Sequence, residues 1–230
     1  MGAHEKACQR ASGLPPDQVA LFDESMDALL AFAGERLGWH RPTPPSMHVR
    51  DWENLDASGR LLDEVWARRA LLDELLDSDP PQLDEAHVAV LRRWRHAVRG
   101  AFVCVRAFES HALYLGVDPG DERAFVVRGL RGPACAHVRA TPSLVALTLL
   151  PFAGHIVTDG RVTHLSDELR PGMEAEVARM LEEALARDAV ETADQLVAYE
   201  RRHPDAGDLT RSLAQLAGMM ARAAPRLTSR

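Results

Sequence analysis

Lysine is almost absent from this sequence of 230 residues: Lys6 is the only one, and every other basic residue is Arg. This preference for Arg indicates coding bias in a GC-rich genome. Acidic residues outnumber basic ones by 34 to 27, which leaves a net charge of −7. Because a surface that binds nucleic acid needs clustered positive charge, this balance argues against nucleic acid as a partner of the whole surface.

Cysteine and long apolar runs are also scarce. The three cysteines, Cys8, Cys104 and Cys135, include no CxxC pair, and Cys104 lies in an apolar run typical of a core. We therefore expect a reduced, cytoplasmic setting. No apolar run approaches the roughly 18 residues of a membrane-spanning helix, and the N-terminal stretch has no apolar h-region, so neither membrane association nor a signal peptide is expected.

The common catalytic signatures are missing. GxSxG, GxGxxG and GxxxxGK[ST] do not occur, which excludes α/β-hydrolase, Rossmann and P-loop assignments. Ser110 and His111 are adjacent, and adjacent residues of a strand point to opposite faces, so they are not expected to pair as nucleophile and base. The sequence leaves open whether the protein is an enzyme, and no cofactor is predicted.

The first part of the sequence has the periodicity of helices. Residues 1–16 are expected to be a flexible tail, and residues 17–99 a helical region. Apolar residues at spacings of three and four, with Gly and Pro at the breaks, predict the individual helices. The predicted helices are 18–37, 59–77 and 83–98.

The pattern changes at Gly100. Short runs rich in Val and Phe predict five or six strands before residue 167, and no segment of helix length separates them, so the sheet should be mostly antiparallel. The dipeptide Asp159–Gly160 is typical of a type I′ hairpin, because both central residues of that turn need a positive φ. We expect this hairpin to join the fifth and sixth strands.

From Pro171 onward the sequence is helical again. The amphipathic segment 171–202 is predicted to be one helix or two helices that break near Asp188, and 208–223 a last helix. The predicted fold is therefore α+β, with N-terminal helices, a central sheet and C-terminal helices. Residues 100–230 should form the sheet and the helices after it, in one compact unit with 17–99.

The predicted fourth strand, 143–150, runs into a motif: Leu-Leu-Pro-Phe, then Gly, Ile and Asp-Gly. Its residues are Leu149, Leu150, Pro151, Phe152, Gly154, Ile156, Asp159 and Gly160. The chain thereby resembles, over about residues 83–185, a group of uncharacterised bacterial proteins. Some members of that group carry a SEC-C zinc motif or are joined to plasmid ORF-3-like domains. Neither feature is visible here, so the resemblance implies no zinc and no activity, and it supports the fold alone.

The predicted hairpin carries one candidate site. If the chain turned at Asp159–Gly160, His155 and His164 would lie opposite each other, and two imidazoles with the Asp159 carboxylate could bind a divalent metal. No HExxH or similar spacing supports such a site. The alternative is a plain hairpin with polar side chains on its solvent face.

A second candidate is the run RRWRHAVR, residues 92–99. On a helix Arg92, Arg95 and Arg99 would share one face and could contact an anion or a nucleic-acid backbone. The alternative is a solvated helix face whose Arg residues pair with acidic neighbours.

Three functions remain open from the sequence. The first, which we favour, is a non-enzymatic interaction or adaptor protein that binds a protein partner or a second copy of itself. Its support is the missing catalytic signatures and the amphipathic terminal helices. The second is a small metal-dependent hydrolase that uses the 155–164 hairpin. The third is a regulatory binder of nucleic acid or nucleotide that uses the 92–99 stripe.

Overall fold

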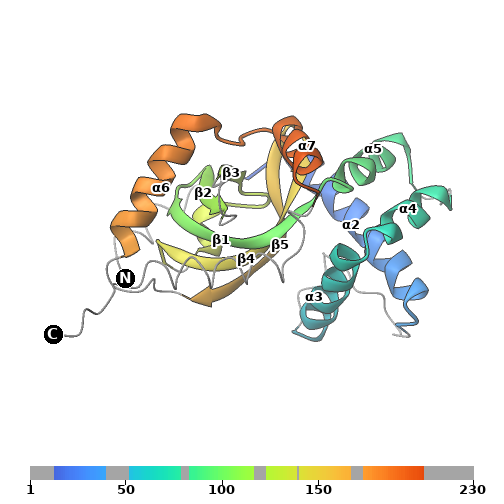
Figure 1. Ribbon diagram of the computed structural model, residues 1–230. Helices are drawn as coiled ribbons and strands as arrows, with labels where there is room; N and C mark the ends of the chain where they lie inside the picture. Colours follow the sequence, from blue (N-terminus) through green and yellow to red (C-terminus); the bar gives the residue numbers. More distant parts are fainter. Residues whose placement is uncertain are drawn as a thin grey trace.

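The computed structural model describes residues 13–39, 52–78, 83–116, 123–138, 140–166 and 173–204, and they form a helical lobe beside a closed barrel (Figure 1). The elements confirm the predicted α+β class with a mostly antiparallel sheet. The lobe consists of α2 (Pro16–Arg36), α3 (Trp52–Ala67), α4 (Ala70–Asp77) and α5 (Glu85–Trp94). The barrel strands are β1 (Val98–Ala107), β2 (His111–Gly116), β3 (Ala124–Arg128), β4 (Ser143–Phe152) and β5 (His155–Ser166). A 3-10 turn, η1 (Ala134–His137), precedes β4, and α6 (Met173–Asp188) and α7 (Ala193–Arg202) follow β5.

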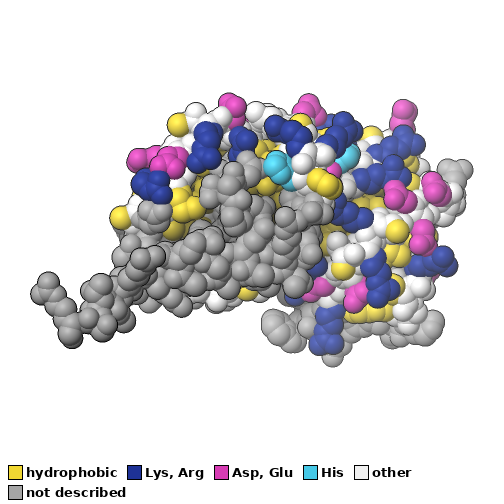
Figure 2. Space-filling view, viewed as in Figure 1, with side chains coloured by type: hydrophobic (Ala, Val, Ile, Leu, Met, Phe, Trp, Pro, Cys, Tyr) yellow, Lys and Arg dark blue, Asp and Glu magenta, His cyan; other side chains and the backbone are white. Residues whose placement is uncertain are grey.

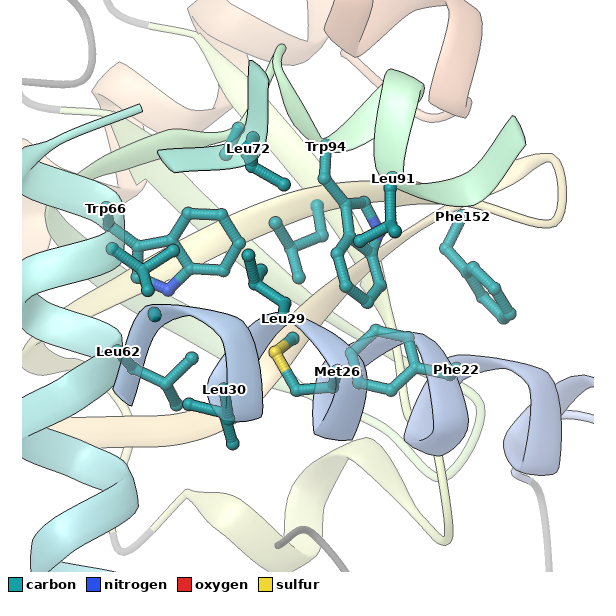
Figure 3. Close-up of a cluster of buried hydrophobic side chains, with 14 of the residues drawn as sticks. Phe22, Met26, Leu29, Leu30, Leu62, Trp66, Leu72, Leu91, Trp94 and Phe152 are labelled. Carbon is teal, nitrogen blue, oxygen red and sulfur yellow. The ribbon is translucent and has the colours of Figure 1, made fainter. Parts of the chain in front are cut away.

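The helical lobe is built around α2. Its apolar residues recur at spacings of three and four, so that Phe22, Met26 and Leu29 lie on one face and are fully buried (Figure 3). The ring of Phe22 packs on Trp94 of α5, with 5.0 Å between centroids, and on Phe152 of β4 at 5.3 Å. Because Phe152 belongs to the barrel, the lobe and the barrel share one hydrophobic core.

Two predicted helices have different ends in the structure. The single helix predicted over 59–77 is wrong: α3 ends at Ala67 and α4 begins at Ala70. The helix predicted over 83–98 is also too long, because α5 ends at Trp94 and Val98 already pairs with β4. In both places a tertiary contact outweighs the local periodicity.

Charged side chains link the lobe to the barrel at two places. Asp63 of α3 pairs with Arg99 of β1 and with Arg161 of β5, the latter with 2.7 Å between Nη1 and Oδ2. Arg69, at the break between α3 and α4, pairs with Glu200 of α7 at 2.7 Å. These contacts fix the orientation of the two halves, in addition to the apolar core that they share.

The barrel has the strand order β1-β2-β3-β5-β4, with β4 closing on β1. Neighbouring strands are antiparallel except β3 and β5, which meet in parallel at Val127 and Ile156. The segment between α6 and α7 occupies the edge between these two strands. There Val190 exchanges backbone hydrogen bonds of 2.8–3.0 Å with β3, and Thr192 bridges to His155 of β5. α7 then buries Leu196 and Tyr199 in the barrel core.

The predicted hairpin at Asp159–Gly160 is wrong, and so is the sixth strand. β5 continues without interruption from His155 to Ser166. The tight turn lies earlier, at Ala153–Gly154, where both residues have positive φ angles of 46° and 79°. Phe152 and His155 are the first pair of this two-residue hairpin. Gly160, with φ of 86°, instead belongs to an irregularity in the pairing of β4 with β5.

The segment after the barrel forms two helices, which is one of the two predicted alternatives. The chain breaks at Asp188, whose φ is 138°, and a capping box at Thr192 begins α7. α6 packs Val177, Leu181 and Ala184 on the outer face of β1, β2 and β3. None of the helices in the described ranges is both long and apolar enough to cross a bilayer. The predicted helix 208–223 lies outside the described residues.

Most of the predicted N-terminal tail, residues 1–12, also lies outside the described residues. Its last part contacts the barrel. Leu14 is buried, and its backbone N–H donates to the carbonyl of Leu130 at 2.9 Å. The backbones approach so closely at this point that a Cβ on Gly13 would lie 2.8 Å from the carbonyl carbon of Arg131.

Candidate binding surface

The structure does not bring together the three side chains of the predicted metal site. His155 and His164 lie nine residues apart on the same strand, a separation on the order of 30 Å at the rise of an extended chain. His155 pairs with Phe152 and His164 with Val145, at the two ends of the β4–β5 ladder. Among the described residues no cluster of three His, Cys, Asp or Glu side chains could hold a metal ion.

Asp159, the third residue of that predicted site, is buried where the lobe meets the barrel. Its Oδ2 accepts a hydrogen bond from Nε1 of Trp66 at 2.9 Å, and its Oδ1 accepts one from the backbone N–H of Arg161 at 3.1 Å. Burial raises the pKa of this carboxyl to about 6, although these hydrogen bonds, another from Thr148 and the charge of Arg161 act against the increase. Asp159 therefore links the two halves of the molecule.

The predicted basic stripe is not a single helix face. Arg92 lies on α5, Arg95 follows its end, and Arg99 belongs to β1. Arg95 pairs with Asp73 and Arg99 with Asp63, so two of the three guanidinium groups are neutralised by acidic side chains. This is the pairing that the alternative interpretation of the stripe expected.

Another group of side chains comes together on the outer face of the barrel, beyond the part that α6 covers. Residues directly opposite in neighbouring strands point to the same face. Arg106 of β1 is opposite Leu113, which packs against α6, and His111 of β2 is opposite Arg128 of β3. We define the Phe108 surface as Arg106, Phe108, His111, Arg128 and His155.

Phe108 is the centre of this surface. Phe108 is 44% exposed, and its ring lies against the imidazole of His111 in a tilted arrangement, with 4.8 Å between centroids and 32° between planes. The short β1–β2 connection is held by η1, because the backbone N–H of Cys135 donates to the carbonyl of Phe108 at 3.2 Å. The backbone N–H of Phe108 donates to the carbonyl of His111 at 2.8 Å. The backbone that carries the exposed ring is therefore held on both sides.

Ser110 corrects one expectation from the sequence. Its Oγ lies 2.9 Å from Nδ1 of His111, a hydrogen bond that strand geometry seemed to forbid. The bond forms because Ser110 precedes β2, in the turn, where side chains do not alternate between faces. It orients the imidazole beneath the ring of Phe108.

The electrostatics of the surface are set by its arginines. Burial and then the guanidinium of Arg128 lower the pKa of both His111 and His155, while Glu191 acts in the opposite direction on His111. Within the described residues no carboxylate is paired with Arg106 or Arg128. Other barrel arginines are paired: Arg99 and Arg161 with Asp63, and Arg131 with Asp23. Neutral imidazoles and uncompensated guanidinium groups therefore surround an exposed aromatic ring.

His side chains lie among Arg side chains near α7 on the face that Figure 2 shows. Of the Phe108 surface, the sequence pointed to His155 alone. The available signal was the spacing Phe108–His111 across a short turn, which places both rings on one face of a hairpin.

Comparisons of the chain with protein-family models, with curated proteins and with solved structures give no match. The resemblance described from the sequence stays a prediction.

Two cysteines near this surface have different states. Cys104 is free, lies in the barrel core, and has its pKa raised to about 12 by burial. Cys135 of η1 is disulfide-bonded. The reduced state expected from the sequence therefore does not describe Cys135, and a cytoplasmic location stays a prediction.

Thiol titration tests this assignment. We expect DTNB to react with one thiol per chain in denatured, unreduced protein and with three after reduction, because the sequence contains three cysteines and a disulfide takes up two. In native protein the reaction should be slow, since the only thiol is that of the fully buried Cys104. Three reactive thiols before reduction would contradict the disulfide.

Proposed function

We propose that this protein is a non-enzymatic binding protein, and that the Phe108 surface is where its partner binds. The observation that carries the proposal is the exposed Phe108 ring, which lies against His111, together with Arg106 and Arg128 on the same face of the barrel, for which the described residues supply no carboxylate partner. Phe is mostly buried in proteins, and aromatic residues and Arg are enriched at the centres of interfaces. An aromatic ring between unpaired guanidinium groups is therefore suited to binding.

The rigidity of the surface supports the same proposal. The backbone on both sides of the ring is hydrogen-bonded, and Ser110 orients the imidazole that the ring stacks on. A side chain that is already in its bound position loses less conformational entropy on association. The shared core and the ion pairs of Asp63 make the helical lobe and the barrel one rigid support for this surface.

Site-specific photocrosslinking in cells tests the proposal. The amino acid p-benzoylphenylalanine would replace Phe108 in one variant and, as matched controls, Leu165 or Leu185, which are the other large apolar residues with high exposure among the described ones. We expect adducts of defined size from position 108 and none of that size from the two control positions. Equal adduct patterns at all three positions, or no adduct at 108, would overturn the proposal.

A further inference from the structure

We propose that the Phe108 surface binds single-stranded nucleic acid, with a base stacked on the ring of Phe108 and phosphates against Arg106 and Arg128. This inference rests on the proposed function and names the class of partner. It depends on three properties of the surface, which are the ring, the two guanidinium groups and the position of these groups on the strands.

The first property is a free aromatic face. One face of the Phe108 ring contacts His111, and the side chain is 44% exposed, which leaves ring surface for a second planar group. Every nucleobase has a flat π-face, and stacking on an aromatic side chain contributes about 1–3 kcal/mol per base. The lower pKa of the His111 imidazole favours its neutral form, so the stacked pair presents an apolar platform.

The second property is the pair of guanidinium groups. Neither Arg106 nor Arg128 has a carboxylate partner in the described part of the chain, so neither must break an ion pair to accept a ligand. A guanidinium group matches the oxygens of a phosphate with two parallel N–H donors. Two acidic residues lie close to this surface. Glu109 follows Phe108 in the sequence, and the charge of Glu191 opposes the lowering of the His111 pKa.

The third property is the position of these groups on three adjacent strands. Arg106 of β1 is opposite Leu113 and Arg128 of β3 is opposite His111, so the two arginines lie on either side of β2, about two strand spacings or roughly 10 Å apart across the sheet. A single strand with unstacked bases can place one base on the ring and its phosphates on both sides. A duplex cannot, because its base faces are covered by their neighbours.

The net charge of −7 fits a short contact of this kind better than a long one. In the barrel from Val98 to Ser166, the described residues include six Arg, at 99, 106, 123, 128, 131 and 161, against the two acidic residues Glu109 and Asp159. At the Phe108 surface the positive charge comes from Arg106 and Arg128, because Arg99 and Arg161 are paired with Asp63 and Arg131 with Asp23. We expect weak binding with a shallow salt dependence, because only two phosphates are neutralised.

Fluorescence anisotropy with the full-length protein tests the inference. The probes are fluorescein-labelled oligo-thymidylate and oligo-uridylate of twelve nucleotides, and a DNA hairpin duplex. We expect both single strands to bind and the duplex to bind at least tenfold more weakly. The logarithm of the binding constant should fall with the logarithm of salt concentration with a slope of about −1.4, for two phosphate contacts on a single strand.

Variants separate stacking from charge. Phe108→Ala should weaken binding by about tenfold or more and Phe108→Tyr by less than threefold, because only Tyr preserves the aromatic face. Arg128→Gln should reduce the magnitude of the salt slope by about 0.7. The matched controls are Leu185→Ala, at a similarly exposed apolar residue of α6, and Arg179→Gln, at an exposed arginine of α6, and both should leave the binding constant unchanged. Circular dichroism would show that each variant is folded.

The outcomes distinguish this inference from the proposed function. Absence of single-strand binding at low salt, equal affinity for the duplex, or affinity unaffected by Phe108→Ala would overturn the inference. In the crosslinking experiment, adducts at position 108 that are digested by nuclease support it. Adducts that resist nuclease and are digested by protease overturn it, yet they leave the Phe108 surface as the binding site of a protein. If no specific adduct forms at position 108, both the inference and the proposed function are wrong.

Discussion

Replacing Phe22 by Ala should cost about 3–5 kcal/mol of unfolding free energy, the range for a large aromatic residue deleted from a packed core. Phe22 is fully buried, and its ring contacts Trp94 of α5 and Phe152 of β4. The variant therefore leaves a cavity at the point where α2, α5 and the barrel meet. Because the helical lobe and the barrel share this core, we expect both to become less stable together.

Two probes report on the two halves. All four Trp residues lie in the helical part of the sequence, at positions 39, 52, 66 and 94, so tryptophan fluorescence follows the lobe. The buried Cys104 thiol, accessible only after unfolding, follows the barrel. We expect the two urea transitions to coincide in the wild type and to shift equally in Phe22→Ala. Transitions that separate would show that the lobe and the barrel unfold independently.

Phe108→Ala is the matched control for this substitution. The same atoms are removed, but from a ring that is 44% exposed and stacked on a single imidazole. The expected change is below about 1 kcal/mol, since exposed positions lose little contact and leave no cavity. A large destabilisation by Phe108→Ala would assign this ring to the core and remove the reason to consider it a binding group.

Two glycine-containing dipeptides show what a local sequence pattern can predict and what it cannot. Asp159–Gly160 has the composition of a type I′ turn, whereas the turn lies at Ala153–Gly154. Both dipeptides contain a glycine with positive φ, so the local preference was satisfied in either place. The choice depends on the barrel, because β5 must run past Asp159 to pair with β4 as far as Leu144. Pairing over a whole strand outweighs the preference of one dipeptide.

The class of each segment was predictable because hydrophobic periodicity is local. The helix α2 and the strands β1 to β4 follow from apolar spacing, whereas β5 was predicted as two strands and α6 and α7 as one of two alternatives. Closure of the barrel does not, because it depends on Val127 meeting Ile156, residues 29 positions apart, and on Val190 pairing with β3. The candidate site was missed for the same reason. Arg106, His111 and Arg128 become neighbours only through the registers of β1, β2 and β3.

The sequence predicted Asp159 as a metal ligand, whereas the structure buries its carboxylate between the lobe and the barrel. The irregular pairing around Gly160 places its side chain against Trp66 of α3, where it is 3% exposed, and so it cannot face a ligand on the surface. Its burial has a measurable consequence for stability as a function of pH. A carboxyl that titrates near 6 in the folded chain and at 3.8 when exposed binds its proton more tightly in the folded state.

The sign of the effect follows from this difference. Below about pH 3 the carboxyl is protonated in both states, and its contribution to stability is at its maximum. Between about pH 4 and 6 the folded state retains a proton that the unfolded state has released, so the unfolding free energy falls as the pH rises. Above about pH 7 both states are ionised and the loss is complete. Since one pH unit corresponds to about 1.4 kcal/mol, Asp159 should lower stability by about 3 kcal/mol between pH 3 and pH 7.

Asp159→Asn removes this titration and preserves the shape of the side chain. We expect the unfolding free energy of the wild type minus that of the variant to decrease by about 3 kcal/mol from pH 3 to pH 7, measured by urea denaturation at each pH. Other titrating groups are common to both proteins and cancel in the difference. Curves that stay parallel over this range would contradict the increased pKa. Trp66→Phe removes a hydrogen bond that favours the carboxylate, so in that background the decline should extend above pH 6. The two variants together test whether the carboxylate of the motif Asp-Gly is a structural link between the lobe and the barrel.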